Sequence, residues 1–391
     1  MSDIVIAGMA RTPIGSFQGS LSSLPAPRLG AVAIQAAMER AGVEPSDVSE
    51  VIMGNVLSAG EGQAPARQAS IYAGIPDSVP TMTINKVCGS GMMAIILGMR
   101  SIRLGESDVV VAGGMESMSQ APYLLPGARD GFRLGHGKAM DSMILDGLWD
   151  PFGDQHAGSC ADLCAKEKNI SREDQDAFAT ESYRRAQEAQ KDCKFSSEIA
   201  PVSVKKRREE VEIDQDEEPS QVKFDRIPTL KPVFDKEGTV TAANASTIND
   251  GAAAVVLMSE ETADKLGCKP LARIVSHGIH AQEPVWFTTA PIGAVPKALE
   301  GAGWKTEDVD LFEINEAFAV VALAAQRELG IDHDKLNVWG GAVALGHPIG
   351  ATGARITVTL LSALADRGKS KGLASLCIGG GEATALCLER L

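Results

Sequence analysis

The sequence contains no uninterrupted apolar run long enough to cross a bilayer as a helix. It has no pair of Cys-x-x-Cys motifs, and its seven cysteines are an odd number scattered over 391 residues. This pattern indicates neither a zinc ribbon nor a disulfide framework, so we expect reduced thiols. Basic residues are also scarce, with 37 Lys and Arg against 51 Asp and Glu. The net charge of -14 disfavours nucleic acid or an anionic membrane surface as the main partner.

The composition that remains is that of a globular protein. Hydrophobic residues make up 44% of the chain, and its length favours two or three domains. Residues 1–8 are typical of a strand, without a basic leader or the apolar core of a secretion signal, and residues 388–391 are not a peroxisomal address. We therefore expect a cytoplasmic protein.

A weak internal repeat predicts the architecture. Residues 41–52 resemble residues 302–313, and residues 109–116 resemble residues 375–382. Each member of the first pair follows a helical pattern and precedes a short apolar strand. Since both pairs occur in the same order, we predict two duplicated halves of alternating strands and helices, with parallel or mixed sheets covered by helices.

A segment of different character separates the halves. Residues 119–240 are rich in glycine, proline and charge, and within them only residues 172–191 have the pattern of an amphipathic helix. We predict an N-terminal half over residues 1–118, a loop domain over 119–240, a return of the N-terminal half to about residue 268, and a C-terminal half over 269–391.

Cys88 is the candidate nucleophile of the N-terminal half. It follows a β-branched strand pattern over residues 79–87 and precedes a helical pattern over 92–103, with glycines that permit a sharp turn. A helix N-terminus stabilises a thiolate, so we expect a thiol that is reactive near neutral pH. The alternative is a buried structural cysteine, because free cysteine is among the most buried residue types.

Three residues of the C-terminal half supply possible partners for this thiol. His347 lies in a glycine-rich turn at the position that the repeat relates to Cys88, and an imidazole can take a thiol's proton and return it. Cys377 ends an apolar strand directly before the glycine run 379–381, whose N–H groups suit an oxyanion hole. That run could instead cradle a phosphate, but no helix pattern or Lys-Ser/Thr pair follows it. The amide of Asn315 can hold a water or a carbonyl oxygen.

Several motifs, in one order, resemble the thiolase family over essentially the whole chain, and within it the acetyl-CoA acetyltransferases. They are residues 11–15, 85–91, 113–118, 244–251, 315–318, 340–355 and 377–381. The resemblance implies an α/β thiolase fold in which two duplicated mixed-sheet and helix halves form a layered αβαβα arrangement. It also implies that the inserted loop domain covers coenzyme A.

The resemblance further implies a role for each candidate residue. Cys88 accepts an acyl group from the first thioester, His347 activates it, and Cys377 exchanges a proton with the α-carbon of the second. Asn315, through a water, and His347 stabilise the enolate oxygen, while the N–H groups of Cys88 and Gly379 hold the other oxyanion. The implied reaction is a reversible Claisen condensation of two acetyl-CoA into acetoacetyl-CoA and CoA, with ping-pong kinetics. Coenzyme A thioesters are substrates, and no metal or redox cofactor is expected.

The same resemblance places six residues along the pantetheine channel: Ser246, Leu148, His156, Phe234, Ala317 and Phe318. The chain departs from the family's biosynthetic members at Ala157, where they carry methionine, and this loss of bulk predicts tolerance for acyl groups longer than acetyl. Pro219 and Arg226 stand where those members place an arginine and a serine near the nucleotide, so we expect Lys223 or Arg226 to contact the phosphates. Residues 280–287 also depart from the family pattern, with no physical account from sequence.

Three other readings stay open. A degradative 3-ketoacyl-CoA thiolase shares the chemistry and differs in chain length. A condensing enzyme of fatty-acid synthesis lacks a second catalytic cysteine at the position of Cys377. A non-catalytic acyl-CoA or lipid carrier on the same scaffold would lack one reactive residue, whereas Cys88, His347 and Cys377 are all present. The resemblance implies a homodimer or, through a loop such as residues 122–141, a homotetramer.

Overall fold

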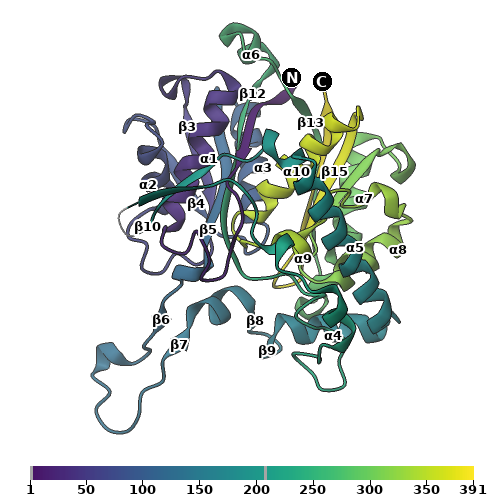
Figure 1. Ribbon diagram of the computed structural model, residues 1–391. Coiled ribbons are helices and arrows are strands. Elements are labelled where there is room, and N and C mark those ends of the chain that lie inside the picture. The colour runs from purple at the N-terminus through teal and green to yellow at the C-terminus, as the bar shows by residue number, and fades with distance from the viewer. Residues whose placement is uncertain (1–2, 207–208) are drawn as a thin grey trace.

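The computed structural model describes residues 3–206 and 209–391, and Figure 1 shows two halves that lie side by side. The N-terminal half contributes strands in the order β4-β3-β5-β12-β1, and the C-terminal half contributes β14-β15-β16-β13. The bounds of the first set are β1 (Ile4–Arg11), β3 (Glu50–Gly54), β4 (Thr81–Ile84), β5 (Val109–Ser117) and β12 (Asn249–Ser259). Those of the second are β13 (Ala272–Ala281), β14 (Leu311–Ile314), β15 (Lys371–Ile378) and β16 (Glu382–Arg390). Two residue pairs between β1 and β13 join the halves, and the short β2 (Gly15–Ser16) pairs with β12.

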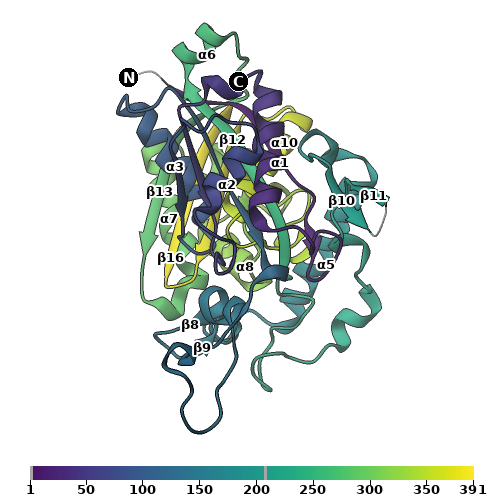
Figure 2. The ribbon, with the colours of Figure 1, turned by 90° about the vertical axis from the view of Figure 1, so that its left-hand side faces the viewer.

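Helices form three layers around these strands, as the two views in Figures 1 and 2 show. α1 (Ala26–Ala41) and α2 (Pro65–Tyr72) cover the outer face of the N-terminal half, and α7 (Ala290–Ala302) and α8 (Ala319–Leu329) cover the other outer face. α3 (Ser90–Arg103) and α10 (Thr352–Asp366) pack against each other between the halves. Every residue of α10 from Thr352 to Leu364 is buried, as a helix enclosed on all sides requires. The layered αβαβα arrangement is thus confirmed.

The first sequence repeat corresponds to a repeated structural unit. α1 and α7 both end at a glycine in the left-handed conformation, Gly42 with φ 69° and Gly303 with φ 66°. A single 3-10 turn then leads into β3 in one half and β14 in the other. The predicted duplication is confirmed by these matching elements.

The second repeat is wrong in register by four residues. Val51 of β3 pairs with Val111, and Phe312, its counterpart in the first repeat, pairs with Leu373. Val111 therefore corresponds to Leu373, whereas the sequence match had aligned it with Cys377. The glycines that produced the match have different structural roles in the two halves. Gly113 stays in β5, where a Cβ would come 2.1 Å from a backbone oxygen of β12, while Gly380 and Gly381 form a turn with φ near 90°.

The segment between the halves contains short hairpins and two longer helices, and α5 (Arg172–Lys191) coincides with the predicted amphipathic helix. Its N-terminus is a capping box formed by Ser171 and Asp174. The other elements of the segment are β6 (Tyr123–Leu124), β7 (Met140–Asp141), β8 (Trp149–Asp150), β9 (Gln155–His156), α4 (Ala157–Glu167), β10 (Val202–Lys206) and β11 (Glu209–Ile213). α6 (Glu260–Leu266) follows β12, and α9 (Ala342–Leu345) precedes α10. The domain limits given above stay a prediction.

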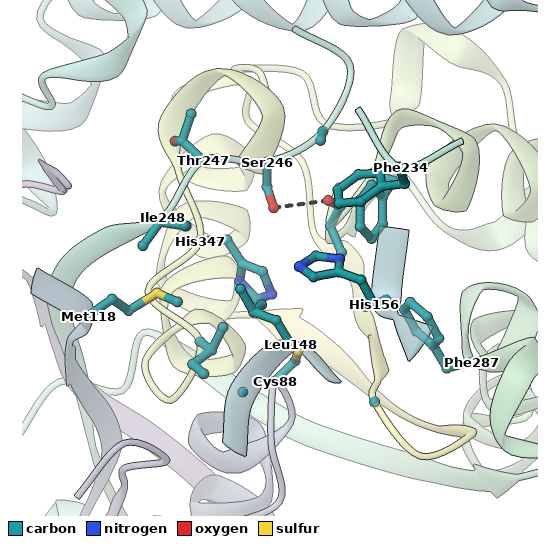
Figure 3. Close-up of a pocket in the computed structure, with 17 residues that line it drawn as sticks. Cys88, Met118, Leu148, His156, Phe234, Ser246, Thr247, Ile248, Phe287 and His347 are labelled. Carbon is teal, nitrogen blue, oxygen red and sulfur yellow. Dashed lines mark hydrogen bonds between the residues drawn. The ribbon is translucent and has the colours of Figure 1, made fainter. Parts of the chain in front are cut away.

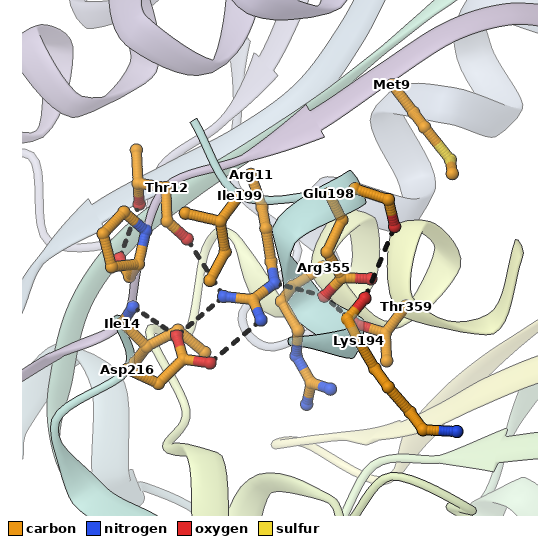
Figure 4. A network of polar contacts seen from close by, with 12 residues as sticks. Met9, Arg11, Thr12, Ile14, Lys194, Glu198, Ile199, Asp216, Arg355 and Thr359 are labelled. Carbon is orange, nitrogen blue, oxygen red and sulfur yellow. Dashed lines mark hydrogen bonds and ion pairs between the residues drawn. The ribbon is translucent and has the colours of Figure 1, made fainter. Parts of the chain in front are cut away.

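A buried ionic network ties this segment to both halves (Figure 4). Arg11 of β1 donates to Glu198 at 2.5 Å and to both oxygens of Asp216 at 2.7 and 2.9 Å, and Thr359 of α10 donates to Glu198 at 3.0 Å. Arg355 of α10 lies in the same cluster, with its closest ion-pair contact at 3.9 Å from Glu313. Removing one member of such a buried cluster leaves an uncompensated charge, which costs about 3–5 kcal/mol. The network therefore fixes the position of α10 relative to the strands.

Across residues 3–206 and 209–391, no helix combines the length and apolarity that a membrane span requires.

Candidate active site

Cys88, His347 and Gly379 line one cavity of about 270 Å³, which opens between the two halves (Figure 3). Cys88 arrives from the turn before α3, His347 from the turn before α10, and Gly379 from the end of β15. The middle helix layer and one strand end thus bring three of the predicted site residues together.

The turn that carries Cys88 is tight and strained. Val87 has φ 46°, an unusual conformation for a β-branched residue. Ser90 holds it in place, because its hydroxyl donates to the Val87 carbonyl at 2.7 Å and accepts from the Lys86 N–H at 2.8 Å. A Cβ on Gly89 would come 2.3 Å from the Cδ1 of Ile378, so a larger residue would require the Ile378 side chain to move. The strained backbone of Val87 thus lies directly before the residue whose sulfur enters the cavity.

The surroundings of Cys88 favour the thiol over the thiolate in the unliganded protein, and the expectation that it is reactive near neutral pH stays a prediction. Burial raises the pKa of Cys88 to about 11, and the charge of Glu116 contributes to the rise. The N–H groups of Gly379 and of Cys88 itself act in the opposite direction on the sulfur. Loss of solvent therefore outweighs the helix N-terminus, and the resting side chain is a thiol.

His347 is held as a neutral imidazole with a defined tautomer. Its backbone N–H donates to Asn249 at 2.9 Å, and its Nδ1 lies 2.6 Å from the Thr352 hydroxyl. That hydroxyl donates its proton to the Pro348 carbonyl at 2.9 Å, so Nδ1 must be the donor to Thr352. Nε2 then carries the free lone pair, and it has no protein partner. Burial, together with the charge of Arg355, lowers the pKa of His347 to about 3.

Cys377 and Asn315 are buried and do not line this cavity. Cys377 is fully buried, and burial followed by the proximity of Cys88 raises the pKa of its thiol well above the usual value. Asn315 is also buried, its N–H donates to the Ser375 carbonyl at 2.9 Å, and both polar atoms of its side chain lack a protein partner. Such an unsatisfied amide suits a bound water, which is the role that the resemblance implies for Asn315.

All six residues expected along the pantetheine channel line the same cavity (Figure 3). His156 stacks on Phe234 with ring centroids 4.6 Å apart, and Phe234 meets Phe318 edge-on at 6.3 Å. Ser246 donates through its hydroxyl to the Ala317 carbonyl at 2.9 Å. The channel is therefore apolar with a few fixed polar groups, as in many small-molecule sites.

Sequence reasoning missed a buried carboxylate that braces the site. Glu116 accepts from Asn55 Nδ2 and Leu57 N on one oxygen, both at 3.0 Å, and from Val56 N at 3.1 Å and Gly350 N at 2.8 Å on the other. It thereby connects the loop after β3 with the turn that carries His347. Burial raises the pKa of Glu116 to about 8, although each of these N–H donors favours its ionised form. Only the motif at residues 113–118 could have pointed to it.

Met118, Ile349 and Phe287 also line the cavity and were not singled out from the sequence. Phe287 belongs to the unexplained segment 280–287, so the structure supplies the missing account. This departure from the family pattern shapes the wall of the site.

Lys223 and Arg226 line a second, more open cavity of about 350 Å³, together with Ala243. Ala243 lies two residues before Ala245, which lines the first cavity. Pro219 is buried and does not line either space. The two basic side chains therefore line a cavity whose wall continues, along residues 243–245, into the wall of the apolar channel.

Among the described residues, no group of three or more His, Cys, Asp or Glu side chains has the arrangement of a metal site.

Comparison with known proteins identifies the family. The family models for the thiolase N-terminal domain and the thiolase C-terminal domain match residues 4–261 and 268–390. An acetyl-CoA acetyltransferase of Cupriavidus necator is 55% identical over 392 residues, covering 100% of both chains. The crystal structure of the Bacillus anthracis acetyl-CoA acetyltransferase has a TM-score of 0.98 at 45% identity, covering 100% of this chain and 99% of that one. An Ascaris suum thiolase in complex with coenzyme A has a TM-score of 0.95 at 46% identity, covering 100% of both chains. The chain belongs to the thiolase family.

Proposed function

We propose that this protein is an acetyl-CoA C-acetyltransferase, which joins two acetyl-CoA into acetoacetyl-CoA and CoA and also runs the reverse thiolysis. The observation that carries the proposal is the single cavity in which a thiol, a neutral imidazole with a free Nε2 and an N–H from the glycine turn meet at the end of an apolar channel. Names of close relatives support the same substrate.

In the first half-reaction, Cys88 attacks the thioester carbonyl of acetyl-CoA while its proton passes to Nε2 of His347. With the pKa of the thiol raised and that of the imidazole lowered, the ion pair is unfavourable in the free enzyme. It forms only as negative charge develops on the carbonyl oxygen, which the N–H groups of Cys88 and Gly379 receive. The carbon–sulfur bond to CoA then breaks, the proton on His347 goes to the leaving CoA thiolate, and acetyl-Cys88 remains.

In the second half-reaction, Cys377 passes its proton to Nε2 of His347, which can then donate to an oxygen, and the Cys377 thiolate removes a proton from the α-carbon of another acetyl-CoA. His347 and a water held by Asn315 stabilise the enolate oxygen, and the enolate carbon attacks the acetyl group on Cys88. The new carbon–carbon bond forms as the carbon–sulfur bond breaks, releasing acetoacetyl-CoA. Cys88 leaves as a thiolate and takes the proton from Nε2 of His347, while Cys377 keeps the proton from the α-carbon, which restores the resting state.

Coenzyme A would extend through both cavities, first the apolar one that contains Cys88 and then the open one beside Lys223 and Arg226. The pantetheine arm runs along Ser246 and the stacked rings of His156 and Phe234, and the nucleotide reaches the open cavity beside Lys223 and Arg226. Two cations at that end favour phosphate groups in a chain whose net charge is otherwise -14. The reaction uses no metal or redox cofactor, so activity should survive exhaustive treatment with a chelator.

The test is direct observation of the intermediate. After incubation with acetyl-CoA, mass spectrometry of the Cys88 peptide should show one acetyl group, and the enzyme should cleave acetoacetyl-CoA in the presence of CoA. A Cys160→Ser variant, which alters a buried thiol outside the cavity, is the control for loss of any cysteine. An unmodified Cys88 with no thiolysis would reject the enzyme and favour a non-catalytic carrier.

We also propose a homotetramer in the cytoplasm. The hairpin β6–β7 projects from the body of the molecule (Figure 1) and carries exposed apolar side chains, with Leu134 fully exposed and Tyr123 68% exposed. β4 is an edge strand with Met82 46% exposed, which offers a second contact between copies. Light scattering of the wild type and of a Leu134→Asp variant should give a tetramer and a dimer, and cell fractionation tests the compartment.

A further inference from the structure

One ion pair joins two turns that build the site. We call them the nucleophile turn, residues 85–90, which carries Cys88, and the glycine turn, residues 378–382, which carries Gly379. The ammonium group of Lys86 in the first contacts the carboxylate of Glu382 in the second. The two residues are 296 positions apart and belong to different halves. The pair therefore crosses the boundary between the halves at the place where the site is assembled.

Both ends of the ion pair are anchored in the backbone. The Lys86 N–H donates to the Ser90 hydroxyl at 2.8 Å, within the nucleophile turn. Glu382 is the first residue of β16, where it pairs with Ile378 of β15 and with Ala281 of β13. A restraint on either side chain is therefore a restraint on the turn that carries it.

Few other contacts hold the two turns together. Gly89 packs against the side chain of Ile378, and the Gly379 N–H acts on the Cys88 sulfur. No other hydrogen bond or ion pair in the described part of the chain connects the two turns. When the sulfur carries an acyl group, the Gly379 N–H faces the acyl oxygen instead. The ion pair is then the remaining polar link between the turns.

The glycine turn depends on a restraint from outside itself. Gly380 and Gly381 have φ of 92° and 90°, and no residue between Ile378 and Glu382 has a side chain. The Gln282 N–H donates to the Gly381 carbonyl at 2.8 Å, which ties the turn to the segment after β13 and not to the nucleophile turn. Glu382 is the first position after the glycines from which a side chain can reach the nucleophile turn.

We propose that Lys86 and Glu382 are positioning residues that set the distance between the two N–H donors of the acyl oxyanion, those of Cys88 and Gly379. The inference rests on the proposed function. An oxyanion hole is effective because its donors are in place before charge develops, so a small displacement of one donor lowers the rate. Neither side chain lines the catalytic cavity, and the pair acts through the two turns.

The exposure of the pair separates this role from a contribution to global stability. The side chains of Lys86 and Glu382 are 25% and 36% exposed, and ion pairs in such positions add little to the free energy of unfolding. Lys194 and Asp366 form a matched pair at 2.9 Å, with side chains 30% and 38% exposed, and neither lines the catalytic cavity. Breaking that pair is therefore the control for loss of one partly exposed ion pair.

The experiment compares Lys86→Met and Glu382→Gln in thiolysis of acetoacetyl-CoA. Each variant should lower kcat about tenfold, less than the roughly 10²–10³-fold effect of losing a whole oxyanion-hole donor. KM should stay within about twofold, because the pantetheine contacts are intact. Exchange of labelled CoA with acetyl-CoA should fall by the same factor as kcat, since the two donors serve both half-reactions. The double variant should lose no more than either single variant, because both changes remove the same link.

The opposite charges of the two residues distinguish positioning from electrostatics. Removing a nearby cation raises the pKa of the Cys88 thiol and removing a nearby anion lowers it, so a purely electrostatic influence predicts opposite effects of the two variants. Positioning predicts equal losses. Asp366→Asn, the control, should keep the kcat of the wild type.

Four results would overturn the inference and leave the proposed function intact. They are opposite effects of the two variants on kcat, losses that multiply in the double variant, wild-type rates in Glu382→Gln, and a loss of thiolysis without a loss of exchange. The last result would place the defect at Cys377, which lies on the strand that leads into the glycine turn. A wild type that neither cleaves acetoacetyl-CoA nor becomes acetylated at Cys88 would instead overturn the proposed function.

Discussion

The two halves of this chain each bring a thiol to the site, and the two thiols have different surroundings. Cys88 is partly exposed to the cavity, and two backbone N–H groups face its sulfur. Cys377 is fully buried, no N–H from another residue acts on it, and Cys88 lies close enough to raise its pKa further. Both thiols are therefore protonated at rest, but only the sulfur of Cys88 faces N–H groups that can receive negative charge.

This difference explains a division of labour. A thiol with donors around it can become the nucleophile once a substrate arrives, because charge moving to the carbonyl oxygen finds N–H groups already in place. A thiol whose pKa is held high is suited to exchanging a proton with a weakly acidic carbon, since proton transfer is most effective between groups of similar pKa. The two thiols come from different places in the repeated unit, because Val111 corresponds to Leu373 and Cys377 therefore corresponds to Met115.

The largest expected effect comes from removing the nucleophile. Cys88→Ser should lower kcat for thiolysis of acetoacetyl-CoA by at least about 10⁴-fold, because a hydroxyl in this setting is a far weaker nucleophile than a thiol. No acetyl group should appear on the variant by mass spectrometry. Appreciable ping-pong turnover by this variant would mean that Cys88 is not the nucleophile and that the proposed roles of Cys88 and Cys377 are wrong.

Removing the second thiol should separate the two half-reactions. Cys377→Ser should still become acetylated at Cys88 while condensation and thiolysis fall by about 10³-fold, the range typical of a lost general acid or base. Exchange of labelled CoA with acetyl-CoA measures the first half-reaction alone and should persist. If exchange and condensation fall together, the assignment of Cys377 to the proton step is wrong.

The pKa values predict different pH dependences for reactivity in the free enzyme and for turnover. Because the pKa of Cys88 is raised to about 11, its alkylation by iodoacetamide should accelerate by about tenfold per pH unit from about pH 7 to about pH 10. His347, with its pKa lowered to about 3, stays neutral over that range and imposes no acid limb on kcat/KM near neutrality. Quantifying the alkylated Cys88 peptide checks this, and a plateau below about pH 8 would contradict the raised pKa.

Much of this architecture was predictable because it depends on local pattern. The duplicated helix, glycine and strand of residues 41–52 and 302–313 could be read directly, and the motifs around Cys88, His347 and Cys377 indicated residues that the fold then brings near one another. The match between residues 109–116 and 375–382 failed because glycine serves close packing in one half and a turn in the other. A composition match does not distinguish these uses.

Other features depend on distances that sequence does not contain. The thiolate expected at Cys88 followed from the nearby helix, but burial decides the balance and is visible only in the folded chain. The cavity wall that Phe287 and Ala157 share joins segments more than a hundred residues apart. Glu116 is another such case, since its partners come from the loop after β3 and from the turn before α10.

The smallest effect provides the sharpest test of how the halves differ. Glu116 in the N-terminal half and Glu316 in the C-terminal half are both buried carboxylates; Glu316 accepts from Ser182 Oγ and Asn337 Nδ2 at 2.7 Å and from Val343 N at 3.1 Å. Exchanging either for glutamine replaces one accepting oxygen by an NH2 group, which then faces N–H or hydroxyl donors. We expect this to lower the free energy of unfolding by about 1–3 kcal/mol, measured by denaturant titration. Only the charge of Glu116 acts on the Cys88 thiol.

Glu116→Gln should therefore lower the pKa of Cys88 and speed its alkylation by up to about tenfold at about pH 9, where Glu116, with its pKa of about 8, is ionised; this corresponds to one pKa unit, even as the fold becomes less stable. Glu316→Gln is the matched control, with a similar loss of stability and unchanged alkylation. A purely structural role for Glu116 predicts equal alkylation in the two variants. That result would show that the carboxylate braces the His347 turn without influencing the charge of the nucleophile across the interface.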